Sequence, residues 1–185
     1  MKRIFCLIIF ISSLFLRLSG QDFDTRRITS GTGLSNNFVT CILQDSDGQM
    51  WFGTWDGLNM YDGKSITVFK PEPGNKESIS NNIIREMIEQ KPGILWVATD
   101  RGINRLDVKT GKAERFFFGS SGWDIPTEHA FIISKDAQDR IFAFIYGQGA
   151  FVFNANAHVF ERVPIPGTNG AVKAIYGKDN DLYIL

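Results

Sequence analysis

Residues 34–62 read LSNNFVTCILQDSDGQMWFGTWDGLNMYD, and residues 79–107 read ISNNIIREMIEQKPGILWVATDRGINRLD. The second stretch aligns with the first, 45 positions later and without a gap. Both contain Ser-Asn-Asn near their start. Other matched identities are Gly48 and Gly93, Trp51 and Trp96, Thr54 and Thr99, Gly57 and Gly102, and Asp62 and Asp107. The chain therefore contains an internal repeat.

Two further copies are looser. In the third, Asp136 matches Asp45 and Phe142 matches Trp51, and one extra residue then brings Gly149 onto Gly57. The fourth begins near Val172 and places Asn180-Asp181-Leu182-Tyr183 in the same turn and aromatic positions. The repeats cover about 34–70, 79–118, 127–163 and 171–185. A period in the forties, with short extended segments and Gly-rich turns, indicates a β-propeller built blade by blade.

Each of the first three units predicts four short antiparallel strands, because apolar and β-branched runs alternate with Asp/Gly turn residues. The expected strands are 38–44, 50–54, 58–61 and 66–69; 83–89, 95–99, 103–107 and 113–118; and 130–135, 141–145, 150–154 and 158–163. The fold class is therefore all-β: a partial propeller of three complete blades and the start of a fourth. A closed propeller needs about four to eight blades. We expect the chain to be the front of a longer protein, as a fragment of a seven-bladed propeller, or a truncated reading frame.

The first twenty residues are typical of a secretory signal peptide. Lys2 and Arg3 precede an apolar stretch from Ile4 to Leu16, and Ser19-Gly20 supply small residues before a cut. An uncleaved membrane anchor is the alternative, and both place the domain of residues 21–185 outside the cytoplasm. Cys41 is then the single cysteine of the mature chain, and we expect a buried, unreactive thiol.

Some repeated residues are expected to be structural. The aromatic series Trp51, Trp96, Phe142 and Tyr183 fits packing between neighbouring sheets, with sugar stacking as the alternative. Gly48 and Gly93 fit turns that need a left-handed backbone, and Asp139 and Asn180 occupy that position later. Gly57 and Gly102 repeat with the framework.

Composition and motifs argue against several functions. Twenty basic and twenty acidic residues balance, so no one-signed surface for nucleic acid is expected. Asp45-x-Asp47-Gly48 resembles the opening of a calcium loop, but no glutamate closes it, and a hairpin turn is favoured. His129 and His158 lack further ligands at metal spacing. We expect no metal, no cofactor and no catalytic residues.

The loops between the second and third strands and the connections into each next blade should emerge at one end of the sheets. We call this end the rim. Its loop residues vary between units, and variable residues on a shared rim are free to bind ligand. The candidate ligand-binding residues are Trp55, Asp56, Arg101, Tyr146 and Gln148, on the same side as Asn36 and Asn81 and opposite Asp47 and Lys91. Aromatic faces beside polar groups suit an oligosaccharide. A solvated rim without function is the alternative.

The motif at 34–62 resembles the two-component regulator propeller repeat, strongly in the first two units and weakly afterwards. The resemblance implies the periplasmic sensor half of a hybrid two-component regulator from Bacteroidetes. Such a regulator would have two seven-bladed propellers, an inner-membrane anchor, a histidine kinase and a DNA-binding domain. It would form homodimers, sense oligosaccharides and control glycan-utilisation genes. No kinase, receiver or DNA-binding motif occurs in these 185 residues, so we expect a sensor segment rather than an enzyme.

Two other classes of function remain open from the residues. One is a secreted propeller enzyme acting on polysaccharide, which needs two carboxylates in one cleft. The other is a propeller that serves as a scaffold for protein interactions.

Overall fold

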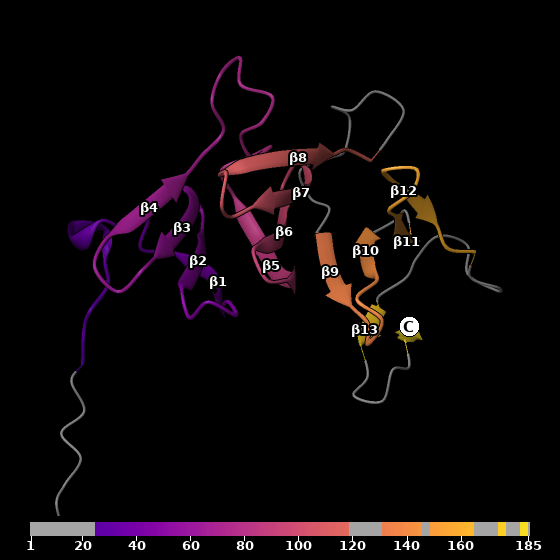
Figure 1. Cartoon of the computed structure of the whole chain (residues 1–185), viewed down its shortest axis with the longest axis horizontal. Coiled ribbons are helices and arrows are strands. Elements are labelled where there is room, and N and C mark those ends of the chain that lie inside the picture. Colours follow the sequence, from indigo (N-terminus) through magenta and orange to yellow (C-terminus); the bar gives the residue numbers. More distant parts are fainter. Residues whose placement is uncertain (1–24, 119–130, 146–148, 165–173, 177–181, 185) are drawn as a thin grey trace, which may run out of the picture.

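A computed structural model describes residues 25–118, 131–145, 149–164, 174–176 and 182–184. The proposed signal peptide, 1–20, lies outside these ranges, as does Asn180. Among the described residues, regular structure is almost entirely β, in three four-stranded antiparallel sheets that follow one another across the molecule (Figure 1). This arrangement confirms the predicted all-β fold of four-stranded units. No helix in the described part is long and apolar enough to cross a membrane.

In every complete sheet the strands follow chain order as a meander. The first sheet contains β1 (Val39–Gln44), β2 (Met50–Thr54), β3 (Gly57–Tyr61) and β4 (Ile66–Phe69); the second contains β5 (Ile84–Lys91), β6 (Ile94–Thr99), β7 (Gly102–Asp107) and β8 (Lys112–Phe116); and the third contains β9 (Phe131–Lys135), β10 (Ile141–Ile145), β11 (Gly149–Asn154) and β12 (Val159–Arg162). A hairpin of β13 (Ala174–Tyr176) and β14 (Leu182–Ile184) follows. A short 3₁₀ turn, Ser30–Thr32, precedes β1. The first strands of consecutive sheets, β1, β5 and β9, lie next to one another.

Short polar turns set the register of each sheet. The carboxylate of Asp45 accepts the backbone N–H groups of Asp47 and Gln49 at 3.1 and 2.8 Å. Its other oxygen accepts the indole N–H of Trp51 at 2.7 Å. Asp136 makes the same turn in the third sheet, accepting the N–H groups of Gln138 and Arg140. Asp45 therefore serves as a hairpin cap, as the turn interpretation predicts.

The core lies between the sheets and is centred on the framework tryptophans. Trp51 and Trp96 are both 0 % exposed. Trp51 packs with Leu95, Val97 and Leu106 of the second sheet. Trp96 packs with residues of the third sheet and has Phe116, Phe153 and Phe160 around its ring, with centroid distances of 5.5, 4.7 and 5.6 Å. Each of these rings fills the space between one sheet and the next.

Phe142 departs from the expected burial between sheets. Its ring is half-buried, and the guanidinium carbon of Arg140 lies 5.5 Å from the ring centroid. The repeat places Phe142 on the face of the third sheet that is directed away from the second, so neither of the two preceding sheets covers it. Tyr183 lies in β14.

The repeated glycines are required either by a close contact with the backbone or by a left-handed backbone angle. A Cβ on Gly102 would lie 2.4 Å from the carbonyl oxygen of Phe116, and one on Gly57 would lie 2.9 Å from that of Phe69. Gly48 and Gly93 have φ angles of 83° and 77° in their turns, and Asp139 has 59° in the same slot. These left-handed values match the turn geometry predicted from the sequence.

Candidate ligand-binding site

The rim is organised around the connection that leads into the second sheet. The N–H of Gly57, at the start of β3, donates to the carbonyl of Asn82 at 2.7 Å. On the other side of the same connection, the N–H of Asp100 donates to the carbonyl of Ile83 at 3.2 Å. The β2–β3 loop and the β6–β7 loop therefore lie on either side of residues 82 and 83. This brings Trp55 and Asp56 to the same end of adjacent sheets as Asp100 and Arg101.

An exposed aromatic pair forms the apolar part of the rim. Phe38 and Trp55 are 54 % and 48 % exposed, with ring centroids 4.1 Å apart and ring planes tilted by 31°. The backbone N–H of Trp55 also donates to the carbonyl of Phe38 at 3.3 Å. The two rings thus form one apolar surface at the end of the first sheet.

The carboxylate of Asp56, the residue after Trp55, forms the polar part of the rim. Asp56 accepts a hydrogen bond from the Lys70 ammonium at 2.6 Å and one from the Asn82 amide at 3.2 Å. The hydrogen bond from Lys70, followed by the one from Asn82, lowers the pKa of the Asp56 carboxyl. The carboxylate is therefore a permanent acceptor at neutral pH, with an ammonium and an amide fixed beside it.

In the second sheet, the rim carries an ion pair where the first sheet carries an aromatic ring. Asp100 occupies the position that matches Trp55. Its carboxylate is buried and accepts both Nε and Nη2 of Arg85, a bidentate pair that orients the guanidinium. The following residue, Arg101, is exposed, and its backbone N–H donates to the hydroxyl of Thr99 at 3.2 Å.

Of the remaining residues predicted to lie on the rim, two are described by the structure and two are not. Tyr146 and Gln148 lie outside the described residues. Asn36 and Asn81 lie on the rim, but their side-chain oxygens accept the N–H groups of Phe38 and Ile83 at 2.7 and 2.8 Å. They therefore cap the start of each sheet.

The opposite end of the sheets carries the β1–β2 and β5–β6 turns. Ser46, next to Asp47, donates through its N–H and its hydroxyl to the Glu89 carboxylate at 2.9 and 2.8 Å. Lys91 is two residues beyond Glu89. Asp47 and Lys91 therefore lie at the end opposite the rim.

A repeated polar network beneath the rim was missed as a unit by the sequence analysis. In the first sheet, Asn59 accepts the N–H of Ser35 at 2.8 Å and donates to the carbonyl of Phe52 at 3.2 Å, while the hydroxyls of Ser35 and Thr54 lie 2.9 Å apart. In the second sheet, the equivalent residues Ser80, Thr99 and Asn104 make the same contacts. The 45-residue spacing of these identities was the available signal.

In the third sheet the alignment places Ile145 at the threonine position and Phe151 at the asparagine position. The polar network is therefore a property of the first two sheets, whose rim loops it supports.

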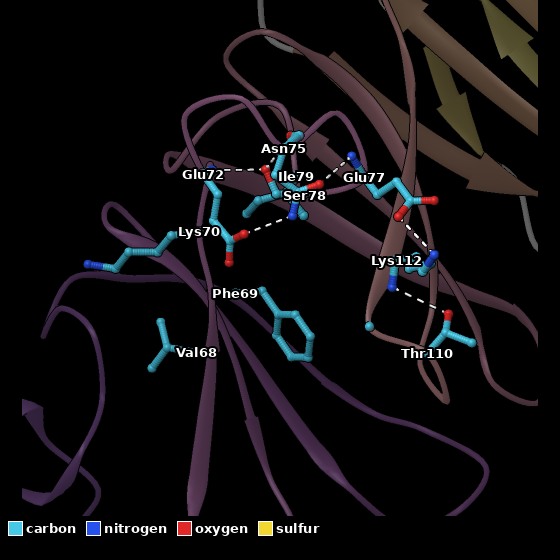
Figure 2. A pocket seen from close by; sticks show the side chains of 11 residues that line it. Val68, Phe69, Lys70, Glu72, Asn75, Glu77, Ser78, Ile79, Thr110 and Lys112 are labelled. Carbon is cyan, nitrogen blue, oxygen red and sulfur yellow. Dashed lines mark hydrogen bonds and ion pairs between the residues drawn. The ribbon is translucent and has the colours of Figure 1, made fainter.

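A separate pocket of about 220 Å³ lies between the outer parts of the first and second sheets (Figure 2). The ring of Phe69 points into it, and Lys112 and Glu77 form an ion pair of 2.8 Å at its edge. Glu72 and Asn75 are joined at 2.7 Å, and the N–H of Glu72 donates to the hydroxyl of Ser78 at 2.8 Å. These contacts fix the segment that leads into the second sheet.

The family model for the two-component regulator propeller matches residues 33–56. Histidine kinase P4 of Formosa agariphila is 35% identical over 77 residues, which are 41% of this chain and 6% of that protein.

Solved structures give the same picture for the fold. The extracellular domain of a putative hybrid two-component system from B. thetaiotaomicron matches with a TM-score of 0.71 and 25% identity, over 86% of this chain and 23% of that one. A second such domain from B. thetaiotaomicron matches with a TM-score of 0.62 and 17% identity, over 88% of this chain and 21% of that one. The WD40 β-propeller domain of Doa1 matches with a TM-score of 0.57 and 12% identity, over 80% of this chain and 48% of the Doa1 chain.

The chain spans less than a quarter of the two extracellular domains that it matches. The whole domains are therefore much larger than the three sheets described here. Residues 33–56 match the two-component regulator propeller repeat, and the fold is that of a β-propeller segment similar to the extracellular domains of putative hybrid two-component systems.

Proposed function

We propose that this chain is part of the extracytoplasmic, periplasmic sensor of a hybrid two-component regulator, and that its rim binds an oligosaccharide. The match to the propeller repeat and the identity with a histidine kinase support the first part. In such a regulator, binding outside the inner membrane would control a kinase and, through it, glycan-utilisation genes. A homodimeric parent and further blades complete this proposal.

The observation that carries the rim site is the exposed pair of Phe38 and Trp55. Neighbouring aromatic rings that together expose an apolar patch are a feature of ligand-binding and interaction surfaces. The C–H face of a sugar ring stacks on aromatic rings, and its hydroxyls need donors and acceptors. Lys70, Asp56 and Asn82 supply both beside Trp55.

The charges of the rim favour binding over hydrolysis. A glycosidase needs one carboxyl group with a raised pKa to protonate the leaving group. The pKa of Asp56 is lowered by Lys70 and Asn82. Asp100 is held in its bidentate pair with Arg85. The Asp56 carboxylate is thus arranged as a fixed acceptor for hydroxyl groups.

Calorimetric titration of the protein against a panel of plant, algal and host oligosaccharides tests the proposal. For a ligand bound by the wild type, Trp55→Ala should weaken affinity about tenfold, in line with the energy of aromatic contacts in binding sites. The matched control is Val159→Ala, an apolar side chain of similar exposure, 45 %, on the outer strand of the third sheet. Equal affinities for wild type and Trp55→Ala, with both proteins folded, would contradict a rim site.

A further inference from the structure

A second pocket lies between the second and third sheets, near the β5–β6 and β11–β12 turns and thus at the end opposite the rim. Its volume is about 210 Å³. Lys91, Arg105, Asp139, Phe153 and His158 are among the residues that line it. We call it the inter-sheet pocket. The pocket in Figure 2 differs from it, because there Lys112 is paired with Glu77.

Two cationic side chains of the inter-sheet pocket, Arg105 and Lys91, have no direct partner among the described residues. Within the described ranges, the side chains of Arg105 and Lys91 make no hydrogen bond or ion pair. Three acidic groups, Asp139, Glu114 and Asp107, lie nearby. Asp139 pairs with Lys135 at 3.1 Å, and Glu114, the cross-strand neighbour of Arg105, lies 3.4 Å from Nδ1 of His158. Asp107 accepts the N–H of Thr110 at 2.9 Å. Arg105 lies near Asp107 and contributes, after the hydrogen bonds of Thr110, to the lowered pKa of its carboxyl.

Arg105 is also a departure from the repeat. It lies directly across from Trp96 in the strand register, where Met60 lies across from Trp51 and Val152 lies across from Phe142. The first and third sheets thus have apolar residues at this half-buried position. Packing alone therefore does not require a guanidinium there.

The backbone of the same pocket carries a second departure. Asp139 and His158 are the two non-glycine residues with positive φ in the described part of the chain, and both line the pocket. His158, at φ 54°, is the last residue of its turn, where the second sheet has Gly111 at φ 70°. A side chain in the left-handed region costs backbone energy that glycine avoids. The imidazole stands edge-on to Phe153, with ring centroids 6.3 Å apart.

We propose that the inter-sheet pocket binds an oxyanion, with Arg105 as its principal contact and Lys91 and His158 beside it. A guanidinium offers two parallel N–H donors to a carboxylate, sulfate or phosphate, which is the strongest pairing available to it. The oxyanion is either a free inorganic ion or an acidic group on a sugar. This site is independent of the rim.

Calorimetry at low chloride concentration distinguishes these sources, with sulfate, phosphate and glucuronate as probes and glucose as the neutral counterpart of glucuronate. The wild type should bind at least one anionic probe and not glucose, with affinity falling as salt is added. Tighter binding of glucuronate than of sulfate or phosphate identifies a sugar-borne carboxylate, and the reverse identifies a free ion.

Variants separate binding from folding. Arg105→Met, which introduces the residue of the first sheet, should weaken binding at least tenfold, whereas Lys64→Met, an exposed lysine of a turn in the first sheet, should not. His158→Gly should weaken binding while the melting temperature stays equal to or above that of the wild type, because the left-handed position is then glycine. Trp55→Ala should bind the anion normally. Absence of binding to every anionic probe, or wild-type affinity in Arg105→Met, would overturn the proposal.

Discussion

Truncation of Trp96 is expected to cause a large loss of stability without any ligand. The side chain is fully buried, contacts three phenylalanine rings, and donates its indole N–H to the side-chain oxygen of Gln90 at 2.9 Å. Trp96→Ala should lower the free energy of unfolding by about 3 to 5 kcal/mol, the usual cost of removing a buried tryptophan. Trp96→Phe keeps most of the apolar contact but leaves the oxygen of Gln90 without its donor, so about 1 to 2 kcal/mol is expected.

Denaturant unfolding, followed by circular dichroism on wild type and variants, measures these differences. The internal control is Phe142→Ala. Phe142 occupies the equivalent position in the third sheet but is half-buried, so its loss should be roughly half or less of that for Trp96→Ala. A loss below about 1 kcal/mol for Trp96→Ala, or one equal to that of Phe142→Ala, would refute the assignment of Trp96 to the core between the sheets.

Three further changes test the framework. Asn104→Ala removes the acceptor for the N–H of Ser80 and the donor to the carbonyl of Val97. It should lower the free energy of unfolding by about 2 to 3 kcal/mol and speed hydrogen exchange at the Ser80 amide. An unchanged exchange rate would argue against the network. Gly53→Ala would place a Cβ 2.5 Å from the sulfur of Cys41 and 2.8 Å from Cγ2 of Ile84. The free energy of unfolding should fall by about 1 to 3 kcal/mol and be partly recovered when Cys41→Ala is added. No recovery would contradict a steric cause. Burial raises the pKa of Glu86, whose carboxylate accepts the N–H of Ile133 at 2.8 Å. The contribution of Glu86 to stability is therefore present at low pH and is lost as pH rises above about 4.3, the ordinary glutamate value. In thermal melts, Glu86→Gln should gain stability relative to wild type between pH 4 and 7, and a difference independent of pH would contradict this.

Much of the fold follows from the sequence because the repeat carries its own alignment. The bounds of β2, β4 and β10 agree with the expected 50–54, 66–69 and 141–145, since turn residues with clear chemistry flank each of these strands. Repetition also locates buried tryptophans, because a residue that packs between sheets must recur at each interface. The half-burial of Phe142 was not predictable, since it depends on what covers the face of the third sheet.

The rim was harder to predict, because its contacts join residues from different units. Trp55 is visible as a loop aromatic, but its partner Phe38 was assigned to a strand. Lys70 and Asn82 come from positions 14 and 26 residues after Asp56, and no local pattern links them. Arg85 likewise reaches Asp100 across the sheet, so the bidentate pair appears only in three dimensions.

A crystal structure of the protein with a bound oligosaccharide tests most directly whether the rim is the binding site. We expect a sugar ring stacked on Trp55 and Phe38, with hydroxyl groups hydrogen-bonded to Asp56, Lys70 or Asn82. A bound oligosaccharide that leaves Trp55 and Phe38 open to solvent and lies elsewhere would contradict this expectation.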